Sequence, residues 1–200
     1  MRLYDNATSG NGYKVRLLLA LLGSAYQRIE MDTDHGETRT ADYLRKNPNG
    51  RIPLLELDDG RLLAESDAIL FYLALDTPFL SSDPWEQAQT LQWMFFEQYS
   101  HEPFVAVSRY IRTHLPAGHE RYAELPALAP RGHSALSVMD QHLSTRDYFA
   151  GDGFSIADIA LYAYTHVADE GGFEMAQYAN ITAWLRRSAE RSGFIAIDSL

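Results

Sequence analysis

The spacing of hydrophobic residues along the chain changes at about residue 76. Before that point, short apolar runs separated by turn residues predict strands at Met1–Tyr4 and Tyr26–Met31. Between these strands, a helix is predicted from apolar residues at helical spacing, namely Val15, Leu18, Leu19 and Leu22. Strands that are joined through a helix are normally parallel, so a parallel pair is expected here.

A β-hairpin is predicted further along this first part. The turn sequence Asp58-Asp59-Gly60 separates two apolar runs, Ile52–Leu57 and Arg61–Ala64. A short helix is predicted around Thr40–Arg45, and another helix opens at Ser66. The predicted order is therefore βαβαββα, which describes an α/β domain.

The second part of the chain shows only helical spacing. Residues 77–84 contain two prolines and predict a linker between an α/β domain (1–76) and an all-helical domain (85–200). The stretch 113–130 is rich in proline and alanine, and it is expected to be a loop. Helices are predicted from about Trp85, around Leu136, Met139 and Leu143, from Ser155, and over Ile181–Ser192.

Composition and charge narrow the possible functions. Of the 200 residues 46% are hydrophobic, and the formal net charge of −10 disfavours a nucleic-acid-binding surface. The sequence has no cysteine, so a disulfide, a thiolate metal site and a cysteine nucleophile are excluded, and we expect no metal. No apolar run approaches the ~18 residues of a membrane span and the N-terminus resembles no signal peptide, so we expect a cytoplasmic protein without a membrane partner.

A polar loop follows the first predicted strand. It carries the hydroxyls of Thr8 and Ser9 and the amide of Asn11, and Gly10 and Gly12 allow the backbone to approach a ligand closely. A loop that runs from a strand into a helix N-terminus is suited to binding an anion. The same residues would also make an ordinary polar helix cap, and the loop alone does not distinguish the two interpretations.

Two further positions suit a ligand that carries peptide groups. Pro53 heads a strand, and it is either an edge-strand proline or a cis proline whose neighbour Ile52 pairs its backbone with an extended ligand. Ser66 is a candidate N-cap for the helix that follows it. Alternatively, Ser66 and the free N–H groups of the first turn would bind the carboxylate of an α-amino acid, while Glu65 or Asp67 binds its ammonium group.

Three sequence blocks together resemble the cytosolic glutathione transferases. They are Asn47-Pro48-x-Gly50-x-Ile52-Pro53-x-Leu55, then Glu65-Ser66-x-Ala68-Ile69-x-x-Tyr72-Leu73, then Phe154-Ser155-Ile156-Ala157-Asp158. The third block is also a predicted capping box, in which Asp158 reaches back to the Ser155 N–H. The loop Ser9-Gly10-Asn11-Gly12-Tyr13-Lys14-Val15 is most similar to the nu class and to the fungal nitrogen-regulator-like members, although Gly10 stands where proline is common.

The resemblance implies a thioredoxin-like first domain, an all-helical second domain and a homodimer. It also implies glutathione as co-substrate, with a cis Pro53, with Ile52 paired to the cysteinyl backbone, and with Glu65 and Ser66 at the γ-glutamyl end. The glycyl carboxylate needs a cation. Arg51 and Arg39 are favoured for that role, and Lys14 and His35 are alternatives.

The mechanism implied by the family is activation of the glutathione thiol. A free thiol has a pKa of about 8.5, so only about 3% is thiolate at pH 7. Lowering the pKa by ~2 units needs about 2.7 kcal/mol, which one or two hydrogen bonds to the thiolate can supply. Ser9 and Asn11 are the candidate catalytic donors. Tyr4 is a weaker alternative, because a tyrosine within a strand is most often a core or rim residue.

The second substrate is expected against the long helix of the second domain. Phe95, Tyr99, His101 and Phe104 are candidate lining residues, although an aromatic stripe at helical spacing is more often core.

Three functions remain open from the sequence. The first is conjugation of glutathione to small hydrophobic electrophiles, a detoxification reaction. The second is glutathione-dependent reduction of disulfides or peroxides, for which glutathione itself would have to supply the sulfur. The third is an interaction module without activity, as in stringent starvation proteins, which is disfavoured because the glutathione-site residues are present.

Overall fold

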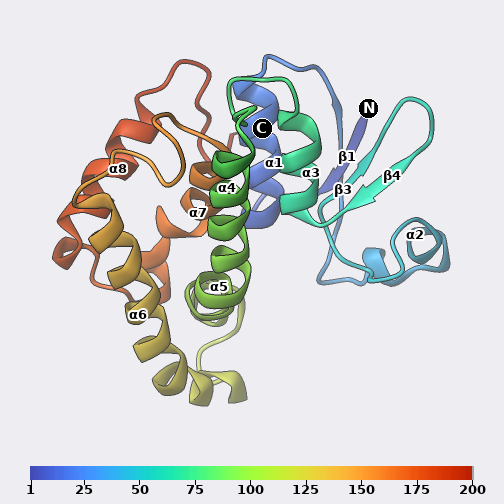
Figure 1. Ribbon diagram of the computed structural model, residues 1–200. Helices are drawn as coiled ribbons and strands as arrows, with labels where there is room; N and C mark the ends of the chain where they lie inside the picture. The colour runs from blue at the N-terminus through green and yellow to red at the C-terminus, as the bar shows by residue number, and fades with distance from the viewer. Residues whose placement is uncertain (200) are drawn as a thin grey trace. The chain divides into compact units, whose positions relative to one another are not determined.

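The computed structural model describes residues 1–199 and divides the chain into two compact units (Figure 1). The first unit comprises residues 1–75 together with the tail 192–199, and the second comprises residues 76–191. The sequence predicts an all-helical domain over 85–200, but residues 192–199 belong to the first unit. The reason is that carbonyl groups of the tail accept hydrogen bonds from side chains of the first helix.

The first unit is built on a four-stranded sheet with the order β2-β1-β3-β4. Its strands are β1 (Arg2–Asp5), β2 (Gln27–Glu30), β3 (Leu54–Glu56) and β4 (Leu62–Ala64). Strand β1 is parallel to β2 and antiparallel to β3, and β3 and β4 form an antiparallel hairpin. The predicted βαβαββα order, parallel pair and hairpin are confirmed.

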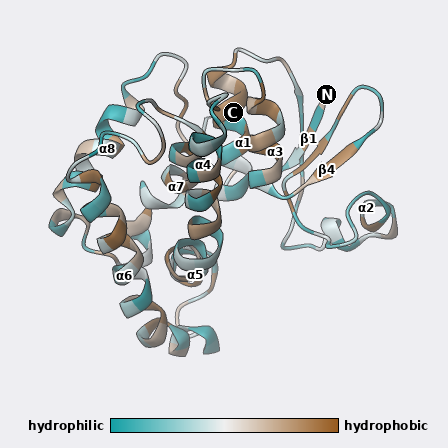
Figure 2. Ribbon diagram, viewed as in Figure 1, coloured by the Kyte–Doolittle hydropathy of each residue, from teal (hydrophilic) through white to brown (hydrophobic). Residues whose placement is uncertain are grey.

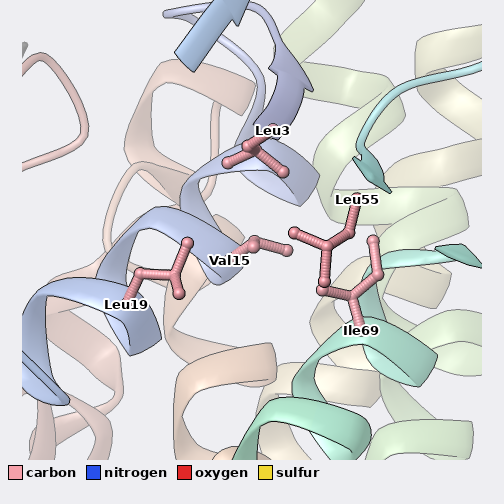
Figure 3. Packing of buried hydrophobic residues seen from close by; sticks show 5 residues of the cluster. All are labelled: Leu3, Val15, Leu19, Leu55 and Ile69. Carbon is pink, nitrogen blue, oxygen red and sulfur yellow. The ribbon is translucent and has the colours of Figure 1, made fainter. Parts of the chain in front are cut away.

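Helices cover both faces of this sheet (Figure 1). They are α1 (Gly10–Leu21), α2 (Ala41–Lys46) and α3 (Ser66–Ala74), with a 3₁₀ turn η1 (Glu37–Arg39) before α2. Helices α1 and α3 lie against one face, where Leu3, Val15, Leu19, Leu55 and Ile69 form a fully buried core (Figure 3). On the other face, α2 packs Tyr43 against Met31 and Leu54. Hydrophobic colour accordingly concentrates on α1, α3 and β4 in Figure 2.

The second unit is helical. Its main helices are α4 (Pro84–Phe96), α5 (Glu102–His114), α6 (Leu125–Leu143), α7 (Ile156–Thr165) and α8 (Ala179–Ala189). Shorter 3₁₀ segments are η3 (Glu120–Glu124), η4 (Ala168–Gly171) and η5 (Met175–Gln177). Within residues 1–199 no helix is both long and apolar enough to cross a membrane.

The long helix predicted from about Trp85 is interrupted. A π-helical turn, η2 (Glu97–His101), stands between α4 and α5. Pro103 occupies the first turn of α5 and has no N–H to continue an α-helical ladder, and the N–H of Glu102 instead bonds the carbonyl of Glu97. The residues on either side thus remain helical, but with one wider turn between them.

The prediction of a loop over 113–130 is wrong at its first two residues, which belong to α5, and in its second half. Segment η3 begins at Glu120 and α6 begins at Leu125. Pro126 lies in the first turn of α6, where the backbone N–H has no acceptor within the helix, so proline is tolerated there. Pro130 lies inside the helix, where it has no N–H to donate to the carbonyl of the preceding turn, and α6 nevertheless continues to Leu143.

The predicted capping box at the start of α7 is confirmed. The Ser155 hydroxyl caps the helix, and Asp158 Oδ2 accepts a hydrogen bond from the Ser155 N–H at 3.0 Å. Asp158 is fully buried, and its Oδ1 also accepts from Trp184 Nε1 of α8 at 2.9 Å and from the Phe149 N–H at 3.3 Å. One carboxylate therefore joins the start of α7, the preceding turn and α8.

Candidate functional site

The loop between β1 and α1 is held by the side chain of Asn6. Its Oδ1 accepts hydrogen bonds from the N–H and the hydroxyl of Thr8, at 3.0 and 2.8 Å. Its Nδ2 donates to the Met31 carbonyl at 3.2 Å, and the Ser9 N–H donates to the Asn6 carbonyl at 3.0 Å. Together these bonds fix Ser9 at the entry to α1.

Ser9 is the N-cap of α1. Its backbone is extended, with φ −70° and ψ 119°, and its Oγ accepts a hydrogen bond from the Gly12 N–H at 3.1 Å. A hydroxyl that accepts in this way keeps its own hydrogen for donation. Capping and anion binding are therefore compatible roles for Ser9, and the helix dipole adds to the positive potential at this point.

Two of the predicted site segments meet at Asn11 and Ser66. Ser66 Oγ donates a hydrogen bond to Asn11 Oδ1 at 3.3 Å, although the residues are 55 positions apart in the chain. Ser66 is buried and is the first helical residue of α3, not the N-cap that the sequence suggests. Because Asn11 accepts through its carbonyl, its amide nitrogen is the part that can donate to an anion. The N-termini of α1 and α3 thus converge on one point.

Glu65 takes the N-cap position of α3 in an unusual conformation. It is exposed and has φ 68° and ψ 115°, with no side-chain capping bond. A non-glycine residue in such a region costs on the order of 1–3 kcal/mol, and these residues gather at ligand sites. The conformation is consistent with a ligand contact at Glu65.

The segment before Pro53 is anchored by α2. The Arg51 carbonyl accepts hydrogen bonds from the Tyr43 hydroxyl at 2.7 Å and from Asn47 Nδ2 at 2.8 Å. The Ile52–Pro53 peptide bond is cis, as the sequence resemblance implies. Pro53 is buried, whereas Ile52, two residues before β3, is half-buried.

The four candidate cations are in different environments. Lys14 is fully buried and pairs with Asp67 at 3.1 Å. His35 is exposed, and its hydrogen bond to Asp32 raises its pKa. Arg39 and Arg51 are both exposed.

Arg39 is linked to the turn that precedes Arg51. Its Nη1 donates to the Asn49 carbonyl at 3.1 Å. Gly50 has φ 61°, and a Cβ there would lie 2.5 Å from Arg39 Nη1, so glycine is needed for this contact. Arg39 and Arg51 therefore remain the candidates for a carboxylate.

Tyr4 lies on the opposite face of the sheet from α1. Its hydroxyl donates to Glu56 Oε2 at 2.7 Å and accepts from Lys46 Nζ at 2.9 Å, and its ring packs edge-on against Tyr43 of α2. Since side chains alternate along a strand, its neighbours Leu3 and Asp5 point toward α1 instead. This placement leaves Ser9 and Asn11 as the candidate donors to a thiolate.

A buried ion pair, which the sequence pattern does not predict, lies beneath the start of α1. Asp5 and Arg16 are 0% and 1% exposed, and Asp5 Oδ2 lies 2.8 Å from Arg16 Nε. A Cβ on Gly12 would overlap the Asp5 carboxylate, so glycine is required there by the protein itself. Burial raises the pKa of Asp5 to about 6, even though Arg16 and the Asn6 N–H act to lower it. The only sequence signal is a charged residue within an apolar run.

The candidate residues for the second substrate have contrasting positions in the second unit. Phe95 and Tyr99 are exposed, at 68% and 80%, whereas His101 and Phe104 are buried. His101 Nε2 lies 3.0 Å from Thr165 Oγ1, and that hydroxyl donates to the Leu161 carbonyl. Nε2 of His101 therefore carries a hydrogen and donates it to Thr165.

Both units match one family. Residues 1–75 match the glutathione S-transferase N-terminal domain, and residues 93–192 match the glutathione S-transferase C-terminal domain. The chain belongs to the glutathione S-transferase family. Its mixed sheet with helices on both faces, followed by a helical unit, is the glutathione S-transferase fold.

Relatives in this family carry different names. The chain is 30% identical to disulfide-bond oxidoreductase YfcG of Escherichia coli, over 92% of this chain and 88% of that protein. It is 28% identical to protein URE2 of Eremothecium gossypii over 96% of its own length, and it spans 66% of that protein.

Solved glutathione S-transferase structures are also similar to this chain. A glutathione S-transferase from Pseudomonas fluorescens is 48% identical, with a TM-score of 0.97 over 99% of this chain and 98% of that one. A glutathione transferase from Pseudomonas putida, solved with one glutathione disulfide bound per subunit, is 27% identical, with a TM-score of 0.85 over 96% of this chain and 87% of that one.

Proposed function

We propose that this protein is a glutathione transferase that binds glutathione in its first unit and activates the thiol as a thiolate. The main support is the hydrogen bond between Ser66 and Asn11, because it joins the proposed γ-glutamyl site to the proposed thiol site. Ser9 and Asn11 donate to the sulfur, Ile52 pairs with the cysteinyl backbone, and Glu65 and Ser66 hold the γ-glutamyl group. Arg51 and Arg39 bind the glycyl carboxylate.

The reaction we propose is conjugation. The thiol proton passes to water, and the remaining thiolate attacks a small hydrophobic electrophile. A carbon–sulfur bond forms, and the leaving group departs with the electron pair of the bond that breaks. The role of the protein is to lower the thiol pKa by stabilising the anion. Phe95 and Tyr99, which are exposed, are the proposed lining of the electrophile pocket, whereas the predicted His101 and Phe104 are buried and are not proposed for it.

A second candidate reaction is reduction of a disulfide, and the similarity to a disulfide-bond oxidoreductase favours it. In this reaction the glutathione thiolate attacks one sulfur of the substrate disulfide and displaces the other sulfur as a thiolate. A second glutathione then attacks the mixed disulfide, which yields glutathione disulfide and the second substrate thiol. Because the chain has no cysteine, both electrons come from the two glutathione molecules. A cytoplasmic homodimer is the proposed assembly for either reaction.

Binding and reaction type are tested by two measurements. We expect the protein to be retained on immobilised glutathione, and failure of the reduced ligand to bind would overturn the proposal, leaving an interaction module as the remaining function. Parallel assays with chlorodinitrobenzene and with hydroxyethyl disulfide then separate conjugation from reduction.

The thiolate donors are tested by Ser9→Ala and Asn11→Ala. Each variant removes one donor to the sulfur, so each is expected to raise the pKa of the bound glutathione thiol by roughly 1 unit, since a hydrogen bond to a charged group contributes about 1.5–3 kcal/mol. The pKa is read from thiolate absorbance in the ultraviolet as pH is varied. An unchanged pKa in both variants would assign activation to backbone amides and the helix dipole.

The role of Ser66 is tested by Ser66→Ala. We expect glutathione to bind more weakly by roughly 1–3 kcal/mol, because a hydrogen bond to a charged group is lost and Asn11 loses its partner. Isothermal titration calorimetry measures the change. Ser137→Ala is a matched control, since Ser137 Oγ donates to the His133 carbonyl of its own helix in the second unit. Equal affinities for all three proteins would make Ser66 a purely structural residue.

A further inference from the structure

The C-terminal tail, residues 192–199, is tied to α1 by side chains of that helix. The Tyr13 hydroxyl donates a hydrogen bond to the Ile195 carbonyl at 2.7 Å. Arg16 Nη1 donates to the Ile197 carbonyl at 2.8 Å, and it lies 3.4 Å from the Ser199 carbonyl. All of these residues belong to the first unit. That unit also carries the loop between β1 and α1, residues 6–9, which we call the thiol loop because it holds Ser9.

Arg16 also contacts the thiol loop itself. Its Nη2 donates to the Ala7 carbonyl at 2.9 Å, two positions before Ser9, and its Nε faces Asp5 Oδ2 at 2.8 Å. The side chain is 1% exposed. One planar guanidinium therefore joins the end of β1, the thiol loop and the tail, a task that a lysine ammonium could not perform with the same geometry.

The surroundings of Arg16 show how the tail protects these contacts. A hollow of about 490 Å³ lies beside the guanidinium and is lined by Arg16, Tyr26, Arg28, Glu30 and Ser199. Ser199 contributes part of its wall, so removal of the tail would open Arg16 to water on this side. Hydrogen bonds to a charged group weaken when water competes for both partners.

We infer that Arg16 is a positioning residue for the thiol site, and that the tail sets the geometry of the thiol loop by holding Arg16 in place. The inference rests on the proposed function, since it assigns a purpose to the loop that carries Ser9. The physical link is the Ala7 carbonyl, because a shift there moves Ser9 relative to a sulfur that must stay within hydrogen-bonding distance. The tail bonds described above go to Tyr13 and Arg16, and none of these bonds involves Ile52, Glu65 or Ser66, so we expect the tail to act on thiol activation and not on affinity.

Three variants test the inference. They are a chain ended after Phe194, Tyr13→Phe, which removes only the hydroxyl that binds the Ile195 carbonyl, and Arg16→Lys. In the shortened chain and in Arg16→Lys we expect the pKa of bound glutathione to rise by roughly half a pH unit or more and kcat to fall roughly tenfold. KM for glutathione should stay within about twofold of the wild type, because the binding contacts at Ile52 and Ser66 remain. Tyr13→Phe should shift the pKa in the same direction by a smaller amount.

Arg28→Gln is the matched control. Arg28 also lies near Asp5, with its Nε 3.7 Å from Asp5 Oδ2, and it pairs with Glu30. The substitution therefore removes a positive charge from the same carboxylate without touching the tail contacts at Ile195 and Ile197. We expect its bound thiol to keep the wild-type pKa.

The outcomes separate this inference from the proposed function. If the wild type binds glutathione and the shortened chain keeps the wild-type thiol pKa, the inference is wrong and the proposed function stands. A pKa rise of equal size in Arg28→Gln would also overturn it, because general electrostatics would then explain the effect. If the wild type itself does not bind glutathione, the proposed function fails and the inference falls with it. If the shortened chain does not fold, the pKa of glutathione bound to the Tyr13→Phe protein decides. A rise supports the inference, and an unchanged pKa overturns it.

Discussion

Asp158→Asn is expected to lower the free energy of unfolding of the helical unit by about 3–5 kcal/mol, because it leaves buried donors without acceptors. In the native protein, Oδ2 accepts from the N–H and the hydroxyl of Ser155, and Oδ1 accepts from Trp184 Nε1 and the Phe149 N–H. Whichever oxygen becomes an NH₂ group then faces donors. Asp158 is fully buried, so these donors are shielded from bulk water as a substitute partner.

The change is measured by urea denaturation followed by tryptophan fluorescence. The sequence has three tryptophans, Trp85, Trp93 and Trp184, and all of them lie in the second unit. The fluorescence transition therefore reports on that unit. Ser155→Ala is the comparison, since it removes the helix cap and only one of the four hydrogen bonds that Asp158 accepts, and it should lower stability by only about 1 kcal/mol. Equal effects of the two substitutions would show that Asp158 acts only through the cap.

The Asp158 effect should also depend on pH. Burial raises its pKa from 3.8 to about 6, so between these values the native state binds a proton that the unfolded state does not bind. The stability that proton binding adds is fully present below about pH 4 and is lost as pH rises through about 6. The stability difference between the wild type and Asp158→Asn should therefore be larger at pH 4 than at pH 7. Asp5 titrates in both proteins and cancels from the difference.

Gly12→Ala is the second substitution for which we expect a large effect. Alanine favours a helix over glycine by about 1 kcal/mol, so the backbone alone would gain stability. The new Cβ would overlap the Asp5 carboxylate, however, and Asp5 is paired with the buried Arg16. Overpacking costs about 1–3 kcal/mol, and breaking a buried ion pair costs about 3–5 kcal/mol. The clash outweighs the helix gain, and we expect a net loss of about 2–4 kcal/mol.

Gly12→Ala should also impair thiol activation, because Gly12 donates its N–H to Ser9 Oγ. Circular dichroism during thermal unfolding measures the loss of stability, and thiolate absorbance measures the second effect. Gly153→Ala is the control, since nothing lies within 4 Å of a Cβ built there and its φ is not positive. If Gly12→Ala unfolds at the same temperature as the Gly153→Ala control, the Asp5 side chain moves aside at no cost in stability.

The fold of the first unit could be predicted from the sequence because its signals are local. The turn Asp58-Asp59-Gly60 and the apolar runs beside it specify the hairpin, and the Ser155–Asp158 spacing specifies a capping box. Proline misled the prediction between residues 113 and 130. A proline in the first turn of a helix has the same local pattern as a proline in a loop, and only packing of the helix decides between them.

The candidate site was less predictable because its geometry depends on long-range pairs. Ser66 looks like a helix cap within its own segment, yet its hydroxyl bonds Asn11 on another helix. Gly12 looks like an opening for a ligand, yet a neighbouring strand residue, Asp5, fills the space beside it. Arg16 has no local signal, because its partners come from the strand, the loop and the opposite end of the chain.

The π-helical turn at Glu97–His101 has a consequence for how the second unit tolerates changes in length. Each residue of an α-helix rotates the chain by about 100°, so an added residue would normally turn every later side chain to another face. In the π-helical turn the Glu102 N–H bonds the Glu97 carbonyl, five residues earlier instead of the four of an α-helix. The turn therefore accommodates one extra residue. Deletion of one residue here would remove the wide turn, although Pro103 would still donate no bond, while the apolar faces of α4 and α5 keep their directions. The turn is therefore the place in this helix pair where sequences of unequal length can be aligned without rotating either core face.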